Sequence, residues 1–546
     1  MNPLELLHSE FLSFLSSQYS HPELVQKSDF TLNTDPQRAT FGDISTNVSL
    51  LLSKSLGRTP RDIAQEIATQ FEHPFINKIE VAGPGFLNIF LKPEVFKTIA
   101  ADLFTQKNEF FKKESPTTAY NLEFVSANPT GPLHIGHGRG GIIGDVLGNV
   151  LKFLGYTVCK EHYINDAGSQ MQKLGISLKI RCQQNLGHEI ELPEGSYQGE
   201  YMKDLAQQCI NEHGTDVITK DDAFFTEYGY KHLLLLLQNT VASYNISFDM
   251  WFSERTLHQG KIEQALTRLS QNGHTYELEG ALWFASTRFG DDKDRVLKKS
   301  DGEYTYAAAD VAYMLDKASR GFTHLIMVLG QDHDSYPKRL EGFRQALGLD
   351  AITLECIIYQ LVSIKENGEQ LRLSKRAGRI VGLADIIEIV GTDIARFFYV
   401  NRKADAHLEF DLALALSNTE ENPVYYLQYA YVRTNSILEK AGAHPEFANI
   451  NADDAQHLTE NEQLLLKKIV ELKSLLHNIS HNYQVHLIAY YLLDLAHMFH
   501  NYYHHNRVLE PETVNQSRGR LLLVTLVKET FDRCLLVMGL TRPEKM

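Results

Sequence analysis

Two histidines stand close together at a point where the sequence passes from a strand-like segment to a helical one. They are the first and last residues of the tetrapeptide His134-Ile135-Gly136-His137. This tetrapeptide follows the strand-like run 121–126 and a turn at 128–132 that contains proline and glycine. The next segment, 138–151, has helical apolar spacing, and its glycines would let a ligand approach the backbone. Since doubly wound α/β proteins bind phosphates at such strand-to-helix turns, the sequence predicts a parallel-sheet domain that binds a nucleotide.

A second basic segment lies far downstream, in the sequence Arg372-Leu373-Ser374-Lys375-Arg376. It follows the apolar run 356–362 and occupies a polar stretch that is typical of a loop. A four-residue match such as the histidine motif can arise by chance, but the two segments together are far more specific. A lysine on a loop is a mobile point charge, which suits contact with the outer phosphates of a nucleotide.

The two segments resemble the HIGH and KMSKS signatures of class I aminoacyl-tRNA synthetases. The surrounding sequence is similar to arginyl-tRNA synthetases in particular, and the likeness runs from about residue 40 to the last residue. The second signature departs from the usual pattern, because arginine replaces the first lysine, leucine replaces methionine, and Arg376 stands where serine is usual. The central lysine, Lys375, is kept. The motifs that carry the likeness are EFVSANP at 123–129, HYINDAG at 162–168, YTYAAAD at 304–310 and ENPVYYLQYA at 421–430.

The resemblance implies that the chain activates an amino acid with ATP. In this reaction a carboxylate attacks the α-phosphate and pyrophosphate leaves, so negative charge builds up on oxygens that preplaced donors must stabilise. His134 and His137 fit as such donors, together with the amide groups around Gly136 and Gly138 at the start of the helix. Mg²⁺ is expected to arrive with ATP, without a metal site of the protein's own. The ATP-binding candidates on the second segment are Arg372, Ser374 and Lys375.

An arginine substrate requires carboxylates, because a forked cation left unpaired in a closed pocket is costly. By resemblance, Asp310 and Glu254 should face the guanidinium and Tyr306 should stack near it. Tyr306 and Asp310 are four residues apart and would share one side of a helix. Each has a structural alternative: Asp310 can cap a helix, Tyr306 can be core, and Glu254 can be a surface carboxylate. The candidates for the amino-acid end are Glu123, Asn128 and Gln331, with Asp166 and Gln170 as weaker ones.

The fold class that we predict is a multidomain α/β protein. Residues 1–110 form an amino-terminal α/β domain, which in the family contacts the outer corner of tRNA. Residues 119–390 form a Rossmann-like, parallel-sheet catalytic domain with a helical insertion near 182–249. Residues 391–421 form a connecting helical segment, and residues 422–546 form an all-α helical bundle that in the family binds the anticodon. The candidate tRNA contacts, which recur at i+4 spacing in the bundle, are Tyr425, Tyr429 and Arg433.

Local patterns give more specific expectations. The spacing predicts a helix over 44–53, a helix starting at Pro60, and a strand–turn–strand unit over 78–91. The polar stretch 106–118 is predicted as a linker, and strand signals end at Gly391. In the last domain the predicted amphipathic helices cover 462–476, 486–501 and 519–538.

The composition excludes several other classes of protein. The five cysteines include no CxxC pair, which argues against a disulfide framework and a structural zinc site. The amino terminus is acidic and amphipathic, unlike a signal peptide, and no apolar run approaches the roughly 18 residues of a membrane span. We expect a cytoplasmic monomer that binds neither membranes nor DNA. The net charge of −15 does not by itself suggest an RNA partner, because the field of the contacting face decides binding.

Three alternatives stay open beside the preferred hypothesis. Gly136, Gly138 and Gly141 also satisfy G-x-G-x-x-G, with Glu161 where NAD-dependent dehydrogenases place a ribose-binding acid. A small-molecule nucleotidyltransferase would share the histidine turn but has little need of a helical carboxy-terminal domain. An inactive RNA-binding relative would have no need of both histidines and Lys375. The preferred hypothesis is an arginine–tRNA ligase, which forms arginyl-adenylate and passes the arginyl group to the 2′-hydroxyl of the terminal adenosine of tRNA(Arg).

Overall fold

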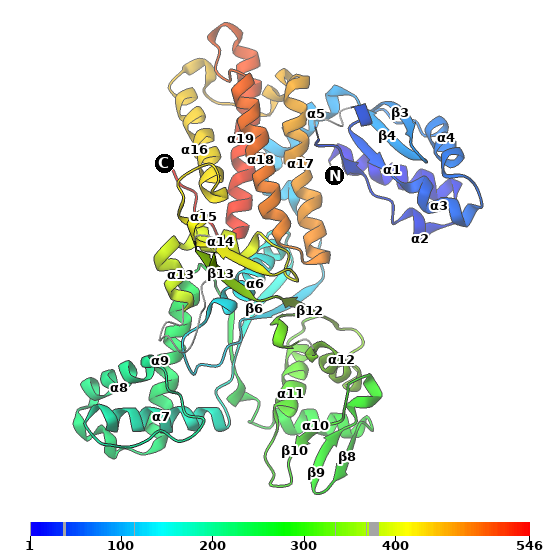
Figure 1. The fold of residues 1–546 in the computed structure, drawn as a ribbon. Coiled ribbons are helices and arrows are strands. Elements are labelled where there is room, and N and C mark those ends of the chain that lie inside the picture. Colours follow the sequence, from blue (N-terminus) through cyan, green and yellow to red (C-terminus); the bar gives the residue numbers. More distant parts are fainter. Residues whose placement is uncertain are drawn as a thin grey trace.

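The structure is a computed structural model and describes residues 2–35, 40–113, 115–333, 335–366, 369–370 and 382–545. The basic segment with Arg372, Ser374 and Lys375 lies outside the described residues. Figure 1 shows a helical bundle on one side of a central sheet and an amino-terminal unit beside the bundle. Two lobes extend on the side of the sheet away from the bundle.

A five-stranded parallel sheet forms the centre of the molecule, in the order β12-β11-β5-β6-β7. Along the chain the sheet grows from β5 through β6 to β7, and then returns to the other side of β5 with β11 and β12. At such a reversal, doubly wound sheets bind ligands beyond the carboxyl ends of their strands. The predicted Rossmann-like sheet is confirmed. Its strands are β5 (Ala119–Phe124), β6 (Thr157–Ile164), β7 (Met250–Ser253), β11 (His324–Gly330) and β12 (Thr353–Tyr359).

Helix α6 (Ile135–Phe153) begins at the histidine turn and is buried on nearly all sides. Its glycines permit a close approach to the sheet. A Cβ on Gly144 would lie 2.3 Å from the side chain of Phe124, and a Cβ on Gly148 would lie 2.7 Å from the side chain of Lys160. The helix therefore lies closer to β5 and β6 than larger side chains would allow.

This close approach predicts that Gly144→Val lowers the free energy of unfolding by about 3 kcal/mol, because the added carbons overlap the ring of Phe124 in a packed interface. Denaturant-induced unfolding measures the change. Gly442→Val is the matched control, since a Cβ at Gly442 meets nothing within 4 Å. A Gly144→Val protein as stable as the control would contradict the packing described here.

The amino-terminal unit combines helices with a four-stranded antiparallel sheet in the order β1-β2-β4-β3. The helix starting at Pro60 and the strand–turn–strand unit are confirmed. The single helix predicted over 44–53 is wrong in its first part, because residues 44–46 pair with β4 as a strand. A short apolar run fits either structure, and sheet pairing decides between them. The elements are α1 (Pro3–Gln18), α2 (Pro22–Val25), β1 (Thr31–Leu32), β2 (Ile44–Thr46), α3 (Val48–Leu56), α4 (Pro60–Gln70), β3 (Ile76–Ala82), β4 (Phe86–Leu91) and α5 (Pro93–Gln106).

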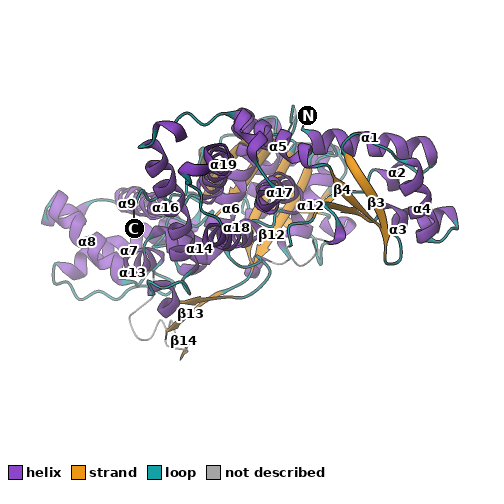
Figure 2. Ribbon diagram, turned by 90° about the horizontal axis from the view of Figure 1, so that it is seen from above, coloured by secondary structure: helices purple, strands orange, loops and turns teal. Residues whose placement is uncertain are grey.

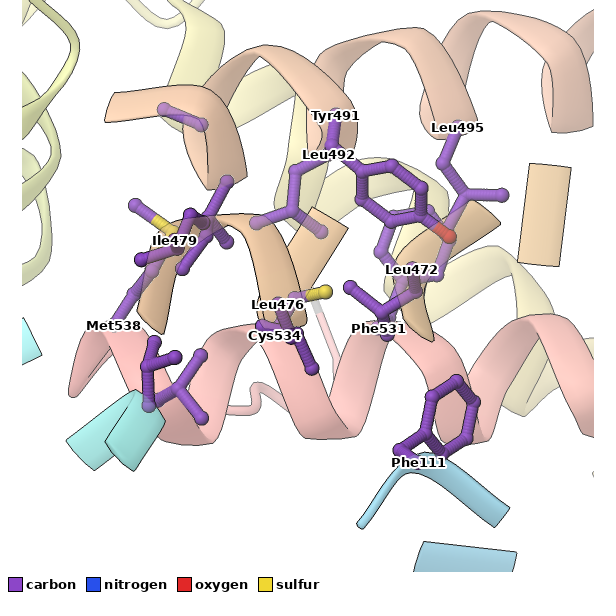
Figure 3. Close-up of a cluster of buried hydrophobic side chains, with 14 of the residues drawn as sticks. Phe111, Leu472, Leu476, Ile479, Tyr491, Leu492, Leu495, Phe531, Cys534 and Met538 are labelled. Carbon is purple, nitrogen blue, oxygen red and sulfur yellow. The ribbon is translucent and has the colours of Figure 1, made fainter. Parts of the chain in front are cut away.

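The stretch 106–118, predicted as a linker, is packed in its first half. Residues Lys107–Phe111 form the short helix η2, in which Phe110 and Phe111 are buried. Figure 3 shows Phe111 beside the hydrophobic cluster of the carboxy-terminal bundle. Its carbonyl oxygen also lies 3.1 Å from Nε2 of His477. Two adjacent aromatic residues in an otherwise polar stretch were the signal for this packing.

Two lobes are inserted between β6 and β12. The first is helical and has a hydrophobic core of its own, and the helical segment expected near 182–249 falls largely within it. The second contains a three-stranded antiparallel sheet, β10-β9-β8, packed with helices. The elements are α7 (Ser169–Asn185), α8 (Glu200–His213), α9 (Asp222–Ser243), α10 (Lys261–Gln271), β8 (Thr275–Leu278), β9 (Ala281–Phe284), β10 (Arg295–Lys298), α11 (Tyr306–Ser319) and α12 (Tyr336–Ala346).

The segment expected to be a purely helical connection, 391–421, contains a strand. This strand, β15, pairs in parallel with β13, and the expectation that strands end at Gly391 is therefore wrong. Four residues are too few to show a period, and the strand exists because β13 supplies a partner. The elements here are β13 (Val362–Glu366), β14 (Glu369–Gln370), α13 (Leu383–Val390), α14 (Thr392–Val400), β15 (Leu408–Asp411) and α15 (Leu412–Leu416).

Helices α16, α17, α18 and α19 lie together as a bundle in the carboxy-terminal part of the chain (Figure 2). The three amphipathic helices predicted in this region are confirmed, and each is longer than expected, by about one to two turns. Leucine, isoleucine and aromatic side chains from three of the helices meet in its core (Figure 3). Within the described ranges, every helix is too short or too polar to pass through a lipid bilayer. The helices are α16 (Pro423–Gly442), α17 (Glu460–Asn482), α18 (His486–His505) and α19 (Val514–Met538).

Candidate active site

A cavity of about 540 Å³ lies beyond the carboxyl ends of β5 and β11, at the reversal point of the sheet. Its walls come from β5, the histidine turn, the first residues after β6, and helices α11 and α12. Segments far apart in the sequence therefore meet at one place. The predicted residues that line the cavity are Glu123, Asn128, His134, His137, Gln170, Glu254, Tyr306 and Asp310.

The two histidines lie face to face at the amino end of α6. His134 caps the helix, and its Nδ1 accepts a hydrogen bond from the amide of Gly136 at 3.1 Å. Nδ1 of His137 accepts one from the amide of His134 at 3.2 Å, and the ring centroids are 3.7 Å apart. A neutral imidazole that accepts at Nδ1 carries its proton on Nε2. Each histidine therefore offers an Nε2–H donor.

Burial keeps both rings neutral. It lowers the pKa of His137 to about 3, and repulsion from His134 contributes in the same direction, against a weaker opposite effect of Asp332. Burial also lowers the pKa of His134. At physiological pH the pair thus acts through hydrogen-bond donors, not as fixed cations.

Gly382, the first described residue after the second basic segment, lies at the histidine turn. Gly382 forms an isolated β-bridge with His134, and the amide of Leu383 donates to the carbonyl of Leu133 at 2.8 Å. The amide of Gly382 also donates to a carboxylate oxygen of Asp385 at 2.7 Å. These bonds fix the positions of Gly382 and Leu383. The roles of Arg372, Ser374 and Lys375 themselves stay predictions, since these residues are outside the described ranges.

Glu123, a candidate for the amino-acid end, is already neutralised by a buried lysine. Nζ of Lys317 lies 2.5 Å from one carboxylate oxygen, and the hydroxyl of Ser126 donates to the other at 3.0 Å. Both Glu123 and Lys317 are buried. The backbone after β5 is strained, because Val125 has a φ of 67°, which a β-branched residue rarely adopts. Glu123 is therefore held as half of an ion pair at the end of β5, just before this turn.

Two other carboxylates remain available to a cation. Burial raises the pKa of Asp310 to about 7; the neighbouring Glu123 and Glu254 raise it too, while a hydrogen bond from Tyr336 and the charge of Arg339 lower it. Burial likewise raises the pKa of Glu254. Its Oε2 is buried and has no hydrogen-bond partner among the described residues. Since an unpaired buried acceptor is costly, a cationic ligand with N–H donors would stabilise Glu254, and its charge would stabilise the ionised form of Asp310.

The raised pKa of Asp310 predicts pH-dependent binding of a cation. Below about pH 7 the carboxyl is protonated in the empty site, so binding must first release that proton, and the dissociation constant for arginine should rise about tenfold from pH 8 to pH 6. Calorimetry in two buffers of different ionisation enthalpy should show proton release at pH 6.5. A dissociation constant that stays flat over this range would contradict the prediction.

Several residues of the cavity wall were not predicted. Tyr313 and Lys317 follow Tyr306 and Asp310 at helical spacing on α11, so the periodicity that joined the first two pointed to the others as well. Asn165 lies within a recognised motif, and its Oδ1 is buried without a partner in the described part of the chain. No local pattern connects α12 to the site. Its contributions to the wall are Tyr336, Arg339 and Leu340.

Four predicted residues of the described ranges do not contribute to the cavity wall: Gly136, whose amide donates to Nδ1 of His134, and Gln331, Asp166 and Gly138. Gln331 is exposed in the short helix after β11 and is not among the residues that line the cavity. Asp166 is buried and accepts hydrogen bonds from Ser253 at 2.6 Å and from the amide of Arg255 at 3.1 Å, so its carboxylate is occupied. Gly138 is in close contact with α13, since a Cβ there would lie 2.5 Å from the side chain of Leu383.

In the dehydrogenase alternative Glu161 would bind the ribose of a dinucleotide, but its carboxylate is already occupied. Glu161 is fully buried and accepts hydrogen bonds from Arg320 at 2.5 and 2.9 Å and from Asn121 at 3.0 Å. Its carboxylate has no capacity left for a ribose. The glycines of the G-x-G-x-x-G pattern serve close packing, as Gly138 does against α13 and Gly141 against Ile246.

In the bundle, two of the three candidate tRNA contacts touch each other. Arg433 donates to the hydroxyl of Tyr429, and its guanidinium lies over the rings of Tyr429 and Tyr503 at 4.5 and 5.0 Å. A guanidinium nitrogen is also 2.9 Å from Nδ1 of His500. Tyr425 is half-buried on the same helix. The result is an exposed cluster of aromatic rings around a cation.

Three family models match successive parts of the chain. They are the arginyl tRNA synthetase N terminal domain over residues 7–91, the catalytic domain of tRNA synthetases class I (R) over 99–405, and the DALR anticodon binding domain over 427–546. Over 94% of its length the chain is 41% identical to an arginine–tRNA ligase of Bacillus licheniformis, of which it covers 93%. The chain belongs to the arginyl-tRNA synthetase family.

Further comparisons agree with this membership. The arginine–tRNA ligase of Bacillus subtilis is also 41% identical over 94% of this chain and 93% of its own. The solved arginyl-tRNA synthetase of Thermus thermophilus superposes with a TM-score of 0.75 over 99% of this chain and 100% of its own, at 21% identity, which shows a shared fold. The resemblance recognised in the sequence is therefore confirmed. Within the arginyl-tRNA synthetase family, the histidine turn belongs to the part matched by the class I catalytic model.

Proposed function

We propose that the chain is an arginine–tRNA ligase, which activates L-arginine with ATP to arginyl-adenylate and transfers it to the 3′-terminal adenosine of tRNA(Arg). One observation carries the proposal. A single cavity is lined by the neutral donors His134 and His137 and by the carboxylates Asp310 and Glu254. Adenylate formation needs donors for phosphate oxygens, and an arginine substrate needs carboxylates. Family membership supports the same activity.

In the activation step, the arginine carboxylate attacks the α-phosphorus of ATP and pyrophosphate leaves. The Nε2–H groups of His134 and His137 donate to phosphate oxygens as charge develops, and the amino end of α6 adds a favourable dipole through the amides near Gly136. Lys375 is predicted to hold the β- and γ-phosphates with the help of Arg372 and Ser374. The described residues include no group of three metal-capable side chains, and Mg²⁺ is proposed to arrive as part of the ATP complex.

The acidic wall of the cavity selects the amino acid. Asp310 and Glu254 receive the guanidinium, which can form paired hydrogen bonds to a carboxylate. Tyr306 is 59% exposed on the first turn of α11 and is free to stack on the substrate. Asn128 is proposed for the amino-acid end, and its amide donates to Gln170 at 2.8 Å. Glu123 and Gln331 stay predictions for that end.

In the transfer step, a ribose hydroxyl of the terminal adenosine takes the arginyl group, and in class I relatives that hydroxyl is the 2′. The bundle is proposed to bind the anticodon, with the cluster around Tyr429 and Arg433 as a surface on which bases stack, and with Tyr425 beside it. The amino-terminal unit is proposed to contact the outer corner of the tRNA. A monomeric state, a cytoplasmic location and the lack of DNA or membrane partners stay predictions.

Charging of total tRNA with each standard amino acid tests the proposal. We expect attachment of arginine alone, dependent on ATP. Absence of arginyl-tRNA would overturn the proposed activity. An increase in NADH fluorescence on binding, with no response to ATP, would instead support the dehydrogenase alternative.

A further inference from the structure

The helical lobe, made of α7, α8 and α9, reaches the turn that precedes the two histidines. The hydroxyl of Tyr201, in the first turn of α8, donates to the carbonyl oxygen of Thr130 at 2.7 Å. This turn, residues 128–132, lies between β5 and α6. Tyr201 is not among the residues that line the cavity, and no step of the proposed chemistry uses it. The contact therefore joins the wall of the site to a helix that is outside it.

Two glycines leave room for the ring of Tyr201. A Cβ on Gly131 would lie 3.0 Å from its hydroxyl oxygen, and a Cβ on Gly199 would lie 2.4 Å from the ring. A larger residue at either position would push the ring and the turn apart. Burial raises the pKa of Tyr201 to about 12, and the nearby Tyr197 adds to this effect. The hydroxyl therefore stays protonated and donates its hydrogen bond at assay pH.

Helix α7 of the same lobe holds the same turn at a second point. Nδ2 of Asn128 donates to Oε1 of Gln170 at 2.8 Å, and Gln170 lies in the first turn of α7. The amide of Thr130 donates to the carbonyl oxygen of Asn128 at 2.8 Å, so the two points belong to one folded segment. The lobe thus holds the side chain of Asn128 from α7 and the backbone two residues later from α8.

The two helices move as one unit, because they share a hydrophobic core. Leu174 and Leu178 of α7 and Met202 of α8 are fully buried in it. Met202 follows Tyr201 directly, so the backbone at Tyr201 is fixed by this core. A tyrosine on such a base is a rigid donor for the turn.

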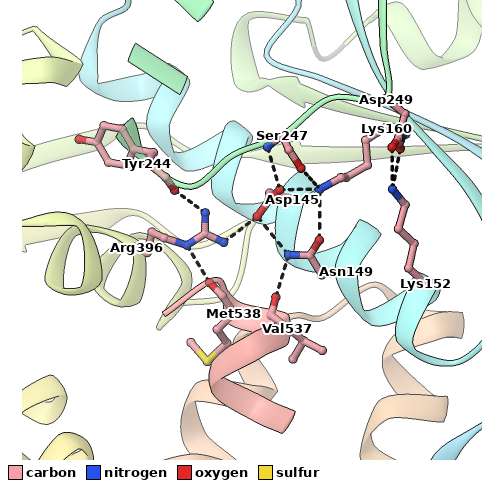
Figure 4. Close-up of polar contacts among 10 residues, drawn as sticks. All are labelled: Asp145, Asn149, Lys152, Lys160, Tyr244, Ser247, Asp249, Arg396, Val537 and Met538. Carbon is pink, nitrogen blue, oxygen red and sulfur yellow. Dashed lines mark hydrogen bonds and ion pairs between the residues drawn. The ribbon is translucent and has the colours of Figure 1, made fainter. Parts of the chain in front are cut away.

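The chain that leaves the lobe is fixed to the catalytic domain (Figure 4). The carbonyl oxygen of Tyr244, which follows α9, accepts a hydrogen bond from Arg396 at 2.6 Å. Arg396 also binds Asp145 of α6 at 2.7 Å and donates to the carbonyl of Met538, the last residue of α19, at 2.7 Å. The lobe is therefore attached to α6, the helix that begins at the histidine turn, and Tyr201 is held at a fixed place beside the turn.

We propose that Tyr201 is a positioning residue for arginine binding, whose hydrogen bond to Thr130 holds the turn so that Asn128 meets the amino-acid end of the substrate. The inference rests on the proposed function for the role of Asn128. The histidines are held separately, by the cap of α6 and by its packing. The hydroxyl of Tyr201 therefore matters for arginine and not for ATP. A purely structural hydrogen bond would not distinguish between the two ligands.

The variant Tyr201→Phe removes the hydroxyl and keeps the ring. Calorimetry on the full-length protein at pH 8 measures the dissociation constants of arginine and of ATP separately. We expect the constant for arginine to rise about fivefold, because one neutral hydrogen bond that holds the turn is lost. The constant for ATP should stay within about twofold of the wild-type value. Thermal unfolding checks that the fold is kept.

Tyr228→Phe is the matched control. The hydroxyl of Tyr228 on α9 donates to Glu212 of α8 at 2.9 Å, so the same kind of bond is lost in the same lobe but away from the turn. Both dissociation constants should stay at their wild-type values. Gly131→Ala disturbs the contact from the side of the turn and replaces Tyr201→Phe if that protein does not fold. It should weaken arginine binding as well.

The dependence on Asn128 is tested in a double variant. In an Asn128→Ala background, Tyr201→Phe should cause no further loss of arginine affinity, because the group that it positions is absent. A full loss in that background would show that Tyr201 does not act through Asn128, and would overturn the inference.

The remaining outcomes separate this inference from the proposed function. If the wild type does not bind arginine, both fall. If it binds arginine but Tyr201→Phe keeps the wild-type constant, or weakens ATP binding by the same factor, the inference is overturned while arginine charging can stand. An equal loss of arginine affinity in Tyr228→Phe would also overturn it. A loss of arginine affinity alone, in Tyr201→Phe and not in Tyr228→Phe, supports it.

Discussion

Replacement of His137 by alanine is expected to slow arginyl-adenylate formation by 10²–10³-fold, equivalent to about 3–4 kcal/mol of transition-state stabilisation. The reason is that a residue that lines the cavity loses its Nε2–H donor, which is proposed to stabilise the charge that develops on phosphate oxygens. Because His137 is only half-buried, the fold should be kept. Single-turnover ATP consumption measures the rate, and thermal unfolding measures the stability.

Three comparisons make this result specific. His137→Asn places an amide donor near the same position and should recover part of the rate. His324→Ala, on a strand of the same sheet but outside the cavity, should leave the rate unchanged. Lys375→Ala should slow adenylate formation by a similar factor, because the outer phosphates lose their cationic partner. Near-wild-type single-turnover rates in both His137→Ala and Lys375→Ala would remove the proposed roles of the two signatures.

Replacement of Asp310 by asparagine is expected to lower kcat/KM for arginine by about 10³-fold, or about 4 kcal/mol, since the guanidinium loses a charged partner in a closed pocket. The free energy of unfolding of Asp310→Asn should rise or stay unchanged. The fold raises the pKa of Asp310 to about 7, so the folded state disfavours the ionised carboxylate. This cost builds up as the pH rises from the ordinary aspartate range to 7 and is fully present at pH 8, where asparagine removes it.

Asp316→Asn is the control on the same helix. Asp316 binds Lys261 at 2.5 Å and Arg320 at 2.9 Å and does not line the cavity. Its replacement should lower the melting temperature and leave KM for arginine unchanged. If Asp310→Asn and Asp316→Asn have the same effect on kcat/KM, Asp310 does not contact the guanidinium. Steady-state charging at pH 8 across arginine concentrations decides between these outcomes.

The histidine turn shows how far sequence reasoning reaches. A strand, a turn and a glycine-containing helix follow one another within 121–151, so their order could be predicted from local spacing. The tautomer of each histidine could not be predicted, because it depends on hydrogen bonds from backbone amides, which form only once the helix has begun. Tyr306 and Asp310 were implied by the resemblance, and their i+4 spacing correctly predicted one face of a helix, α11.

The acidic residues show where sequence reasoning stops. From the sequence, Glu123 and Asp166 are expected in the same pocket as Asp310 and Glu254, the guanidinium partners that the resemblance implies, and local spacing does not show which of these carboxylates are already paired. Lys317 neutralises the first, and Ser253 with the amide of Arg255 occupies the second. Asp310 and Glu254 stay in the cavity wall, and burial raises the pKa of both. Strand β15 and the contribution of α12 to the cavity wall were not predicted for the same reason, because both depend on contacts that local spacing does not show.

The sequence by itself determined the order of the chemical groups: histidines at a helix start, a tyrosine and an aspartate on one helical face, and amphipathic helices at the end. These properties depend on neighbours within a few residues, which the sequence contains. The tertiary structure decided which carboxylates stay unpaired and how α6 is fixed to α19. Those outcomes depend on hydrogen bonds and ion pairs between residues that only the order of the strands and the packing of the bundle bring together.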